Sequence, residues 1–190
     1  MIQTSGQYKI AGILDSRLKT GSTVAGVSVL GDDEKLAELF DDGIKNACIA
    51  VGSIRNNSTR RSLFEKVKQI GFKIPHLIHP ESILTEGLHI SEGVQIMAGA
   101  VIQTGSSIGE NTIINTGSII EHDCEIGRHV HICPGTVISG GCDIGDEAFI
   151  GVGAIVIQGI KIGINAVVAA GAVVIRDVPD NSTVIGVPAK

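Results

Sequence analysis

The amino-acid sequence predicts a β-solenoid preceded by a small α/β domain. Between residues 90 and 179 an aliphatic residue recurs every six positions, over fifteen consecutive hexads. The third residue after each aliphatic is nearly always Gly, Asn or Asp, which tolerate positive φ, and the fourth is mostly small. Upstream of residue 80, extended apolar runs alternate with helical patterns, as is typical of an α/β domain.

Each hexad of the repeat reads as one flat side of a parallel β-helix. The aliphatic and the small residue point inward, and the Gly, Asn or Asp makes the corner. Only His129 and Glu147 interrupt the corner series. Three sides complete a triangular coil, so residues 18 apart are expected to lie above one another, roughly 4.8 Å apart.

The upstream elements follow from periodicity and capping residues. Asp32 or Asp33 is expected to cap a first helix and Asn57 or Ser58 a second, which Gly71 ends. In order, the expected elements are a strand at 9–15, a loop at 16–25, a strand at 27–30, a helix to about 42, a strand at 47–51, a helix at 57–69, and an extended run at 72–78.

Composition excludes several classes of protein. A net charge of −5 argues against a general nucleic-acid binder. No run of 18 apolar residues occurs and no signal peptide is recognisable at the start, so we expect a cytoplasmic protein without a membrane partner. Cys124 and Cys142 occupy the small inward position of consecutive coils and are expected to stack in the core. The absence of a C-x-x-C pair gives no support to a cysteine metal site.

A ligand site is expected where the upstream strands end, because parallel sheets bind ligands at the carboxyl ends of their strands. Asp15 follows the first strand, and the loop Gly52, Ser53, Ile54, Arg55 follows the third. Asp15 and Gly52 are therefore candidate substrate-binding residues. Alternatively, Asp15 simply ends a strand and Gly52 simply allows a turn.

The whole chain resembles one family of hexapeptide-repeat acyltransferases. The segments that carry the resemblance are GILD at 12–15, AVG at 50–52, LIHP at 77–80, INTGSIIEHDCEIG at 114–127 and VIGVPAK at 184–190. The family comprises sialic-acid O-acetyltransferases and UDP-4-amino-sugar N-acetyltransferases, including enzymes of bacillosamine synthesis. The resemblance implies a left-handed β-helix acetyltransferase domain at 81–190, a Rossmann-like nucleotide-sugar-binding domain at 1–80, and a homotrimer with acetyl-CoA between subunits.

Two departures from the family pattern concern the first domain. Family members usually begin with a strand and a glycine-rich, His-containing loop that contacts the nucleotide, and this sequence starts at what resembles the second strand. Ser16 stands where relatives often have a second Asp. The domain is therefore expected to be truncated, without its usual first strand and Gly-rich loop.

Acetyl transfer from a thioester requires a base for the attacking group and a donor for the carbonyl oxygen. His122 is the predicted base, because it sits outward at a corner and an imidazole ordinarily titrates near neutral pH. Asp123 or Glu121 could orient the imidazole, and the resemblance favours Asp123. The corner position of Asp123 is the alternative reason for an acid there. Gly140 is 18 residues after His122, so its N–H is expected one rung above the base, facing the thioester oxygen.

The remaining site residues come from the column geometry and the resemblance. Gly141 lies beside Gly140, and the corner residues Val152 and Ala170 are expected to form the opposite wall for acetyl-CoA in a trimer. The resemblance implies that His131 lies near the thioester and Asn115 near the acceptor sugar. We expect direct attack in a ternary complex, because the nearest thiol is interior.

Other function classes were weighed against this one. His122, His129 and His131 invite comparison with a γ-carbonic-anhydrase-like metal hydratase, but no two of them are 18 apart, and we expect no metal. An inert scaffold is a further alternative. The predicted activity is acetyl-CoA-dependent N-acetylation of a nucleotide-linked 4-amino sugar, with sialic-acid-type O-acetylation as the alternative.

Overall fold

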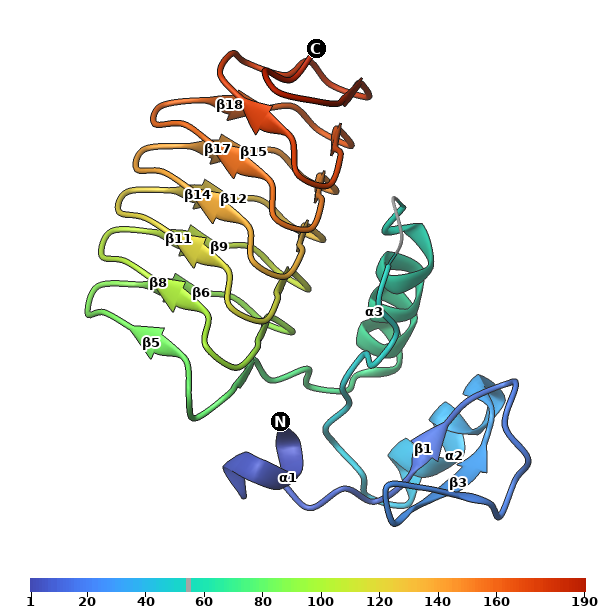
Figure 1. Ribbon diagram of the computed structural model, residues 1–190. Helices are drawn as coiled ribbons and strands as arrows, with labels where there is room; N and C mark the ends of the chain where they lie inside the picture. Colours follow the sequence, from blue (N-terminus) through green and yellow to red (C-terminus); the bar gives the residue numbers. More distant parts are fainter. Residues whose placement is uncertain (54–55) are drawn as a thin grey trace.

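The computed structural model describes residues 1–53 and 56–190. A stack of triangular coils makes up most of the molecule, and the helix α3 (Ser58–Ile70) stands beside it, roughly along its axis (Figure 1). A smaller unit with three short strands and two helices lies below α3. Within the described residues, none of the helices is both long and apolar enough to cross a membrane.

The coil stack consists of two-residue strands that recur every six residues and pair in parallel with the strand 18 residues away, as Ile114 does with Ile132. The seven-stranded sheet contains β4 (Leu77–Ile78), β7 (Gln95–Ile96), β10 (Ile113–Ile114), β13 (His131–Ile132), β16 (Phe149–Ile150), β19 (Val167–Val168) and β21 (Thr183–Val184). The six-stranded sheet contains β5 (Ile83–Leu84), β8 (Val101–Ile102), β11 (Ile119–Ile120), β14 (Val137–Ile138), β17 (Ile155–Val156) and β20 (Val173–Val174). The five-stranded sheet contains β6 (His89–Ile90), β9 (Ser107–Ile108), β12 (Glu125–Ile126), β15 (Asp143–Ile144) and β18 (Lys161–Ile162). The predicted solenoid is confirmed.

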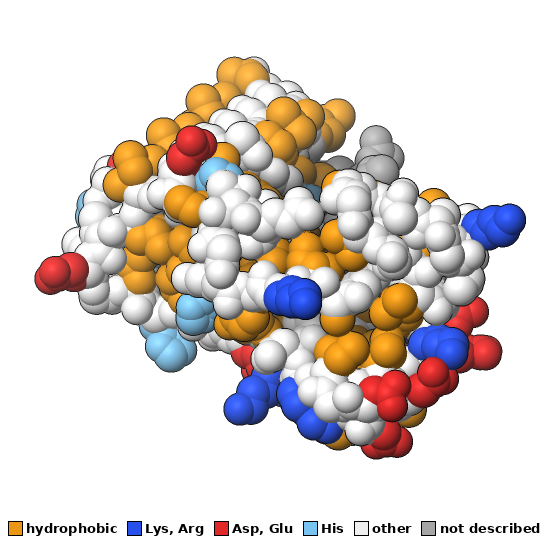
Figure 2. Space-filling model, turned by 90° about the horizontal axis from the view of Figure 1, so that it is seen from below, with side chains coloured by type: hydrophobic (Ala, Val, Ile, Leu, Met, Phe, Trp, Pro, Cys, Tyr) orange, Lys and Arg blue, Asp and Glu red, His pale blue; other side chains and the backbone are white. Residues whose placement is uncertain are grey.

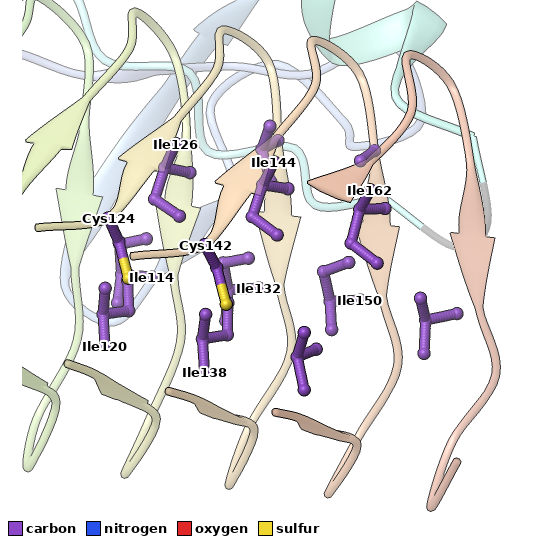
Figure 3. Packing of buried hydrophobic residues seen from close by; sticks show 14 of the residues in the cluster. Ile114, Ile120, Cys124, Ile126, Ile132, Ile138, Cys142, Ile144, Ile150 and Ile162 are labelled. Carbon is purple, nitrogen blue, oxygen red and sulfur yellow. The ribbon is translucent and has the colours of Figure 1, made fainter. Parts of the chain in front are cut away.

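The interior of the stack is filled by the aliphatic and small columns, as the hexads predict. Ile120, Ile138 and their equivalents are fully buried. Cys124 and Cys142 point inward among these isoleucines on successive coils, with exposures of 0% and 1% (Figure 3). At the corners, the two exceptions His129 and Glu147 adopt φ values of 58° and 63°, so the backbone turns there as it does at the glycines.

The outer faces of the stack differ in chemistry. The outward residues of the six-stranded sheet are all aliphatic, and the outward residues of the five-stranded sheet are all polar. In the view from below, rows of apolar side chains run along the stack, whereas acidic and basic side chains gather over the N-terminal unit (Figure 2). The six-stranded face therefore exposes apolar surface that a partner would cover.

The N-terminal unit contains α1 (Ile2–Ser5), β1 (Ile13–Leu14), β2 (Thr23–Val24), β3 (Val27–Gly31), a 3-10 turn η1 (Asp33–Lys35) and α2 (Leu36–Asp41). β3 pairs in parallel with β1 and antiparallel with β2. The predicted loop at 16–25 is thus wrong in part, because its end forms a hairpin strand. Asp32 caps the first helical segment through the N–H of Glu34, as expected.

The predicted strand at 47–51 is wrong. Residues 47–51 belong to no ladder, and a single bridge joins Asn46 to Lys73. The carbonyl of Ile49 accepts hydrogen bonds from the side chains of Arg60 and Gln95, and the carbonyl of Val51 accepts one from Arg60. Side chains therefore satisfy the acceptors that a neighbouring strand would otherwise satisfy.

α3 ends at Gly71, whose φ of 109° confirms the predicted stop. Its packing against the stack is polar as well as apolar. Phe64 contacts the ring of His129 edge to face, and Lys68 pairs with Glu110 at 2.7 Å. The side chain of Asn57 makes no capping bond and instead donates to the carbonyl of Glu147, so the predicted capping role of Asn57 is wrong. α3 thereby covers the corner between the five- and seven-stranded sheets.

Candidate active site

Two corners of the stack remain beside the one that α3 covers. We call the turn from the six- to the five-stranded sheet the His122 corner, which comprises residues 121–124 and their equivalents 18 residues apart. We call the turn from the seven- to the six-stranded sheet the Asn115 corner, which comprises residues 115–118 and their equivalents. The predicted site residues of the solenoid divide between these two corners.

His122 projects outward, with 59% of its side chain exposed. Its Nδ1 lies 2.8 Å from Oδ2 of Asp123, a residue whose φ of 58° also makes the corner. Asp123 thus serves both of the roles considered for it, an orienting acceptor and a corner residue. When Nδ1–H donates to the carboxylate, Nε2 is left unprotonated and able to accept a proton.

Gly140 lies on the rung directly above His122. A Cβ added at Gly140 would lie 2.6 Å from Nε2 of His122, so only glycine leaves room for the imidazole there. The N–H of Gly140 has no acceptor within the described parts of the chain, whereas the N–H of Gly141 donates to the carbonyl of His122. The free N–H therefore lies close to the imidazole, which is the arrangement expected of a base beside an oxyanion donor.

A groove of about 380 Å³ runs up the His122 corner, lined by His122, Asp123, Gly140, Gly141, Gln158 and Gly159. Its floor is mostly backbone, so an extended ligand could approach closely. A larger hollow of about 650 Å³ lies over the five-stranded sheet, among Asp143, Lys161 and other residues that include no histidine. The chemistry of the side chains favours the smaller groove as the candidate active site.

At the Asn115 corner, a buried histidine connects the stack to the N-terminal unit. His131 is 7% exposed, and its ring packs edge to face against Phe149. Its Nε2 lies 3.3 Å from Nδ2 of Asn115, and its Nδ1 lies 2.6 Å from Oγ of Ser53. Burial, and then the nearby charge of Arg60, lower the pKa of His131 to about 4. His131 is therefore neutral at physiological pH.

Arg60 is the site-building residue that sequence analysis missed. It is 2% exposed, and it ties residues 49–51 to the stack through the carbonyls of Ile49, Val51 and Asn111. Burial lowers its pKa to about 10, so the guanidinium stays charged at neutral pH. Its place in a helix with Arg61 next to it in the sequence gave no signal of this role.

The remaining predicted residues lie apart from the His122 corner. Asp15 accepts from the N–H of Arg17 in its own turn, and Gly52 is exposed next to Ser53. Ile54 and Arg55 of the predicted loop lie outside the described residues. Val152 is 54% exposed at the Asn115 corner, where Ala170 follows one coil above.

The three histidines of the hydratase alternative do not converge. His122 is at its own corner, His129 is under α3, and His131 is on the seven-stranded sheet. Over residues 1–53 and 56–190, no group of three His, Cys, Asp or Glu side chains is arranged to hold a metal ion.

Comparison with protein families agrees with this architecture. Residues 105–140 match the bacterial transferase hexapeptide (six repeats), and residues 1–67 match the PglD N-terminal domain. The parallel sheets together with the hexapeptide match fit a left-handed β-helix. The molecule is thus a hexapeptide-repeat transferase with an added N-terminal domain. A search of curated proteins gave no match.

Solved structures identify the family. Perosamine N-acetyltransferase from Caulobacter crescentus, in complex with CoA and GDP-perosamine, is 40% identical, with a TM-score of 0.92 over 100% of this chain and 87% of that chain. The acetyltransferase domain of PglB from Neisseria gonorrhoeae, in complex with acetyl coenzyme A, is 36% identical, with a TM-score of 0.89 over 99% and 89%. The chain belongs to this family of amino-sugar N-acetyltransferases, as the resemblance at 114–127 indicates.

Proposed function

We propose that the protein transfers the acetyl group of acetyl-CoA to the 4-amino group of a nucleotide-linked sugar. The observation that carries the proposal is the His122 corner, where an oriented imidazole and a free backbone N–H lie side by side. The support from relatives is direct, since one was solved with CoA and GDP-perosamine and another with acetyl coenzyme A. We place the protein in the cytoplasm, where both substrates would be available.

In the proposed mechanism, Nε2 of His122 accepts a proton from the amine as the nitrogen attacks the thioester carbonyl. Asp123 holds the Nδ1–H side of the ring and stabilises the imidazolium that forms. The N–H of Gly140 donates to the oxyanion. The intermediate then collapses, the C–S bond breaks, and the thiolate of CoA leaves and takes up a proton. Cys124 is fully buried and takes no part, so attack is direct.

The acceptor sugar and the cofactor are assigned to further residues. Asn115 and His131 would contact the sugar and the acyl end of acetyl-CoA. Gly141, Val152 and Ala170 would line the cofactor path, the last two from a neighbouring subunit. The apolar outer ladder of the six-stranded sheet supports this arrangement, because it is the surface a second copy would bury.

A homotrimer would complete the active site. Within one chain the His122 and Asn115 corners lie at opposite edges of the six-stranded sheet, separated by roughly 20 Å of extended chain. If three copies pack their six-stranded faces around a threefold axis, the His122 corner of each meets the Asn115 corner of its neighbour. We therefore propose that each active site lies between subunits.

We also propose that residues 1–80 form a Rossmann-like unit for the nucleotide and residues 81–190 the catalytic unit, with β4 joining them. Asp15 and Gly52 are the assigned nucleotide-sugar contacts. The parallel pair β1 and β3 and the match of residues 1–67 support the assignment. The truncation of this unit at its start stays part of the proposal.

Product analysis with a panel of sugar nucleotides tests the function. The protein is incubated with acetyl-CoA and GDP-, UDP- or CMP-linked sugars, and the products are identified by mass spectrometry and NMR. Acetylation of a 4-amino group supports the proposal. Acetylation of a hydroxyl would instead establish the O-acetyltransferase alternative. Failure to consume acetyl-CoA with every acceptor would favour an inert scaffold.

Mixing two inactive variants tests whether the site is shared. His122→Ala and Asn115→Ala are refolded or coexpressed as a 1:1 mixture. A site built from two subunits would regain about a quarter of wild-type activity, because half of each contributing corner is intact. Each variant assembled alone is the matched control. No recovery in the mixture would place the whole site within one chain.

A further inference from the structure

A chain of hydrogen bonds runs from the Asn115 corner through His131 to the N-terminal unit, and its direction can be worked out. The Oδ1 of Asn115 lies 2.8 Å from the N–H of Thr116, which can only donate. The amide NH₂ of Asn115 must therefore face His131. Nδ2 of Asn115 donates to Nε2 of His131 across 3.3 Å, so Nε2 carries no proton.

The tautomer of His131 follows from that contact. A neutral imidazole holds one proton, and with Nε2 acting as acceptor the proton is on Nδ1. Nδ1–H then donates to Oγ of Ser53, 2.6 Å away. The oxygen of Ser53 is thereby used as an acceptor, and its own hydrogen is left without an acceptor among the described residues.

The position of Ser53 is fixed from below by Arg60. The guanidinium holds the carbonyls of Ile49 and Val51, the latter at 3.0 Å, and the same arginine is bound to the carbonyl of Asn111 in the stack. Gln95 holds the carbonyl of Ile49 as well. The segment that carries Ser53 is thus built against the seven-stranded sheet before any ligand arrives, and Ser53 is only half-buried.

We propose that Ser53 is a substrate-binding residue, which presents its hydroxyl hydrogen to an acceptor oxygen of the nucleotide-linked sugar. The inference rests on the proposed function. The oxygen belongs either to the diphosphate or to a hydroxyl of the sugar, and the two share the chemistry of a hydrogen-bond acceptor. His131 acts through Ser53 as a positioning residue that fixes the direction of this bond.

Steady-state kinetics of Ser53→Ala, with acetyl-CoA and GDP-perosamine as probes, provide the first test. The variant is expected to raise the KM for GDP-perosamine about ten-fold, since one hydrogen bond to the substrate is lost. The KM for acetyl-CoA and kcat should stay within about two-fold of wild type. Ser53→Thr should restore the KM, and Ser22→Ala, whose hydroxyl bonds within its own turn, is the matched control.

Binding of GDP alone distinguishes the two sources of the oxygen. A ten-fold loss of GDP affinity in Ser53→Ala assigns the diphosphate, and unchanged GDP affinity with a raised KM assigns the sugar. Unchanged GDP affinity together with an unchanged KM would overturn the inference and leave the proposed function standing. A wild-type protein that acetylates no sugar nucleotide would instead overturn the proposed function.

A ¹⁵N NMR spectrum of the histidines gives a readout independent of turnover. The side chain of His131 should show a protonated Nδ1 and an unprotonated Nε2 at neutral pH. Ser53→Ala should shift this signal toward a mixture of tautomers. A proton found on Nε2 in the wild type would reverse the direction of the chain and contradict the inference.

Discussion

The two histidines nine residues apart, His122 and His131, occupy opposite environments on the same scaffold. His122 stands at a corner beside a carboxylate, with most of its side chain in solvent. His131 sits on a strand under residues 48–53, close to a buried arginine. One residue type is therefore used in two ways: an exposed imidazole can exchange protons, and a buried neutral one can only hold hydrogen bonds in fixed directions.

Removing the exposed imidazole is expected to have the largest effect. His122→Ala should lower kcat about 10³-fold, because the amine loses its base. The thermal midpoint and acetyl-CoA affinity should stay close to wild type, since the side chain packs against little. Stopped assays with acetyl-CoA and GDP-perosamine measure the first, and calorimetry the second. Retention of more than a tenth of kcat would remove His122 from the proposed role.

Titrating the buried imidazole tests the other side of the comparison. The pKa of His131 is lowered to about 4, so the folded state takes up its proton later than the unfolded chain does. Stability from this group is fully present above about pH 6.5 and is lost as pH falls toward 4, by about 3 kcal/mol. His131→Gln should lack this component, measured as the difference between denaturation free energies at pH 7 and pH 4.

Other groups also titrate in this range, which is why the difference between the two proteins is the quantity of interest. The pKa of His129 is lowered as well, chiefly by burial, and it remains in both proteins. Parallel stability curves for wild type and His131→Gln would show that His131 is protonated in the folded state, against the environment described.

The smallest effect is expected from the carboxylate that orients His122. Asp123→Asn should lower kcat about ten-fold through the weaker hydrogen bond to Nδ1, with little change in KM. Asn accepts the positive φ of the corner, so the substitution removes the charge and keeps the turn. An unchanged kcat would assign Asp123 to the corner alone.

The His122 corner could be predicted from the sequence because its geometry is local and periodic. The hexads fix which residue faces out, and the spacing of 18 puts Gly140 against the ring of His122. The buried arrangement around His131 could not. It depends on contacts between residues 51 to 91 positions apart, made by Asn57, Arg60 and Ser53. No repeat records such contacts, and the apolar run at 47–51 suggested a strand instead.

The constant register of the stack has a consequence for how its length can vary. Each turn of the coil rests only on the turns beside it. Eighteen extra residues would add one storey and leave every wall facing its original direction. An indel of any other size, unless looped out at a corner, would rotate the upper storeys relative to the lower ones. The imidazole and the amide above it come from adjacent storeys, so they keep their partnership only under changes counted in whole turns.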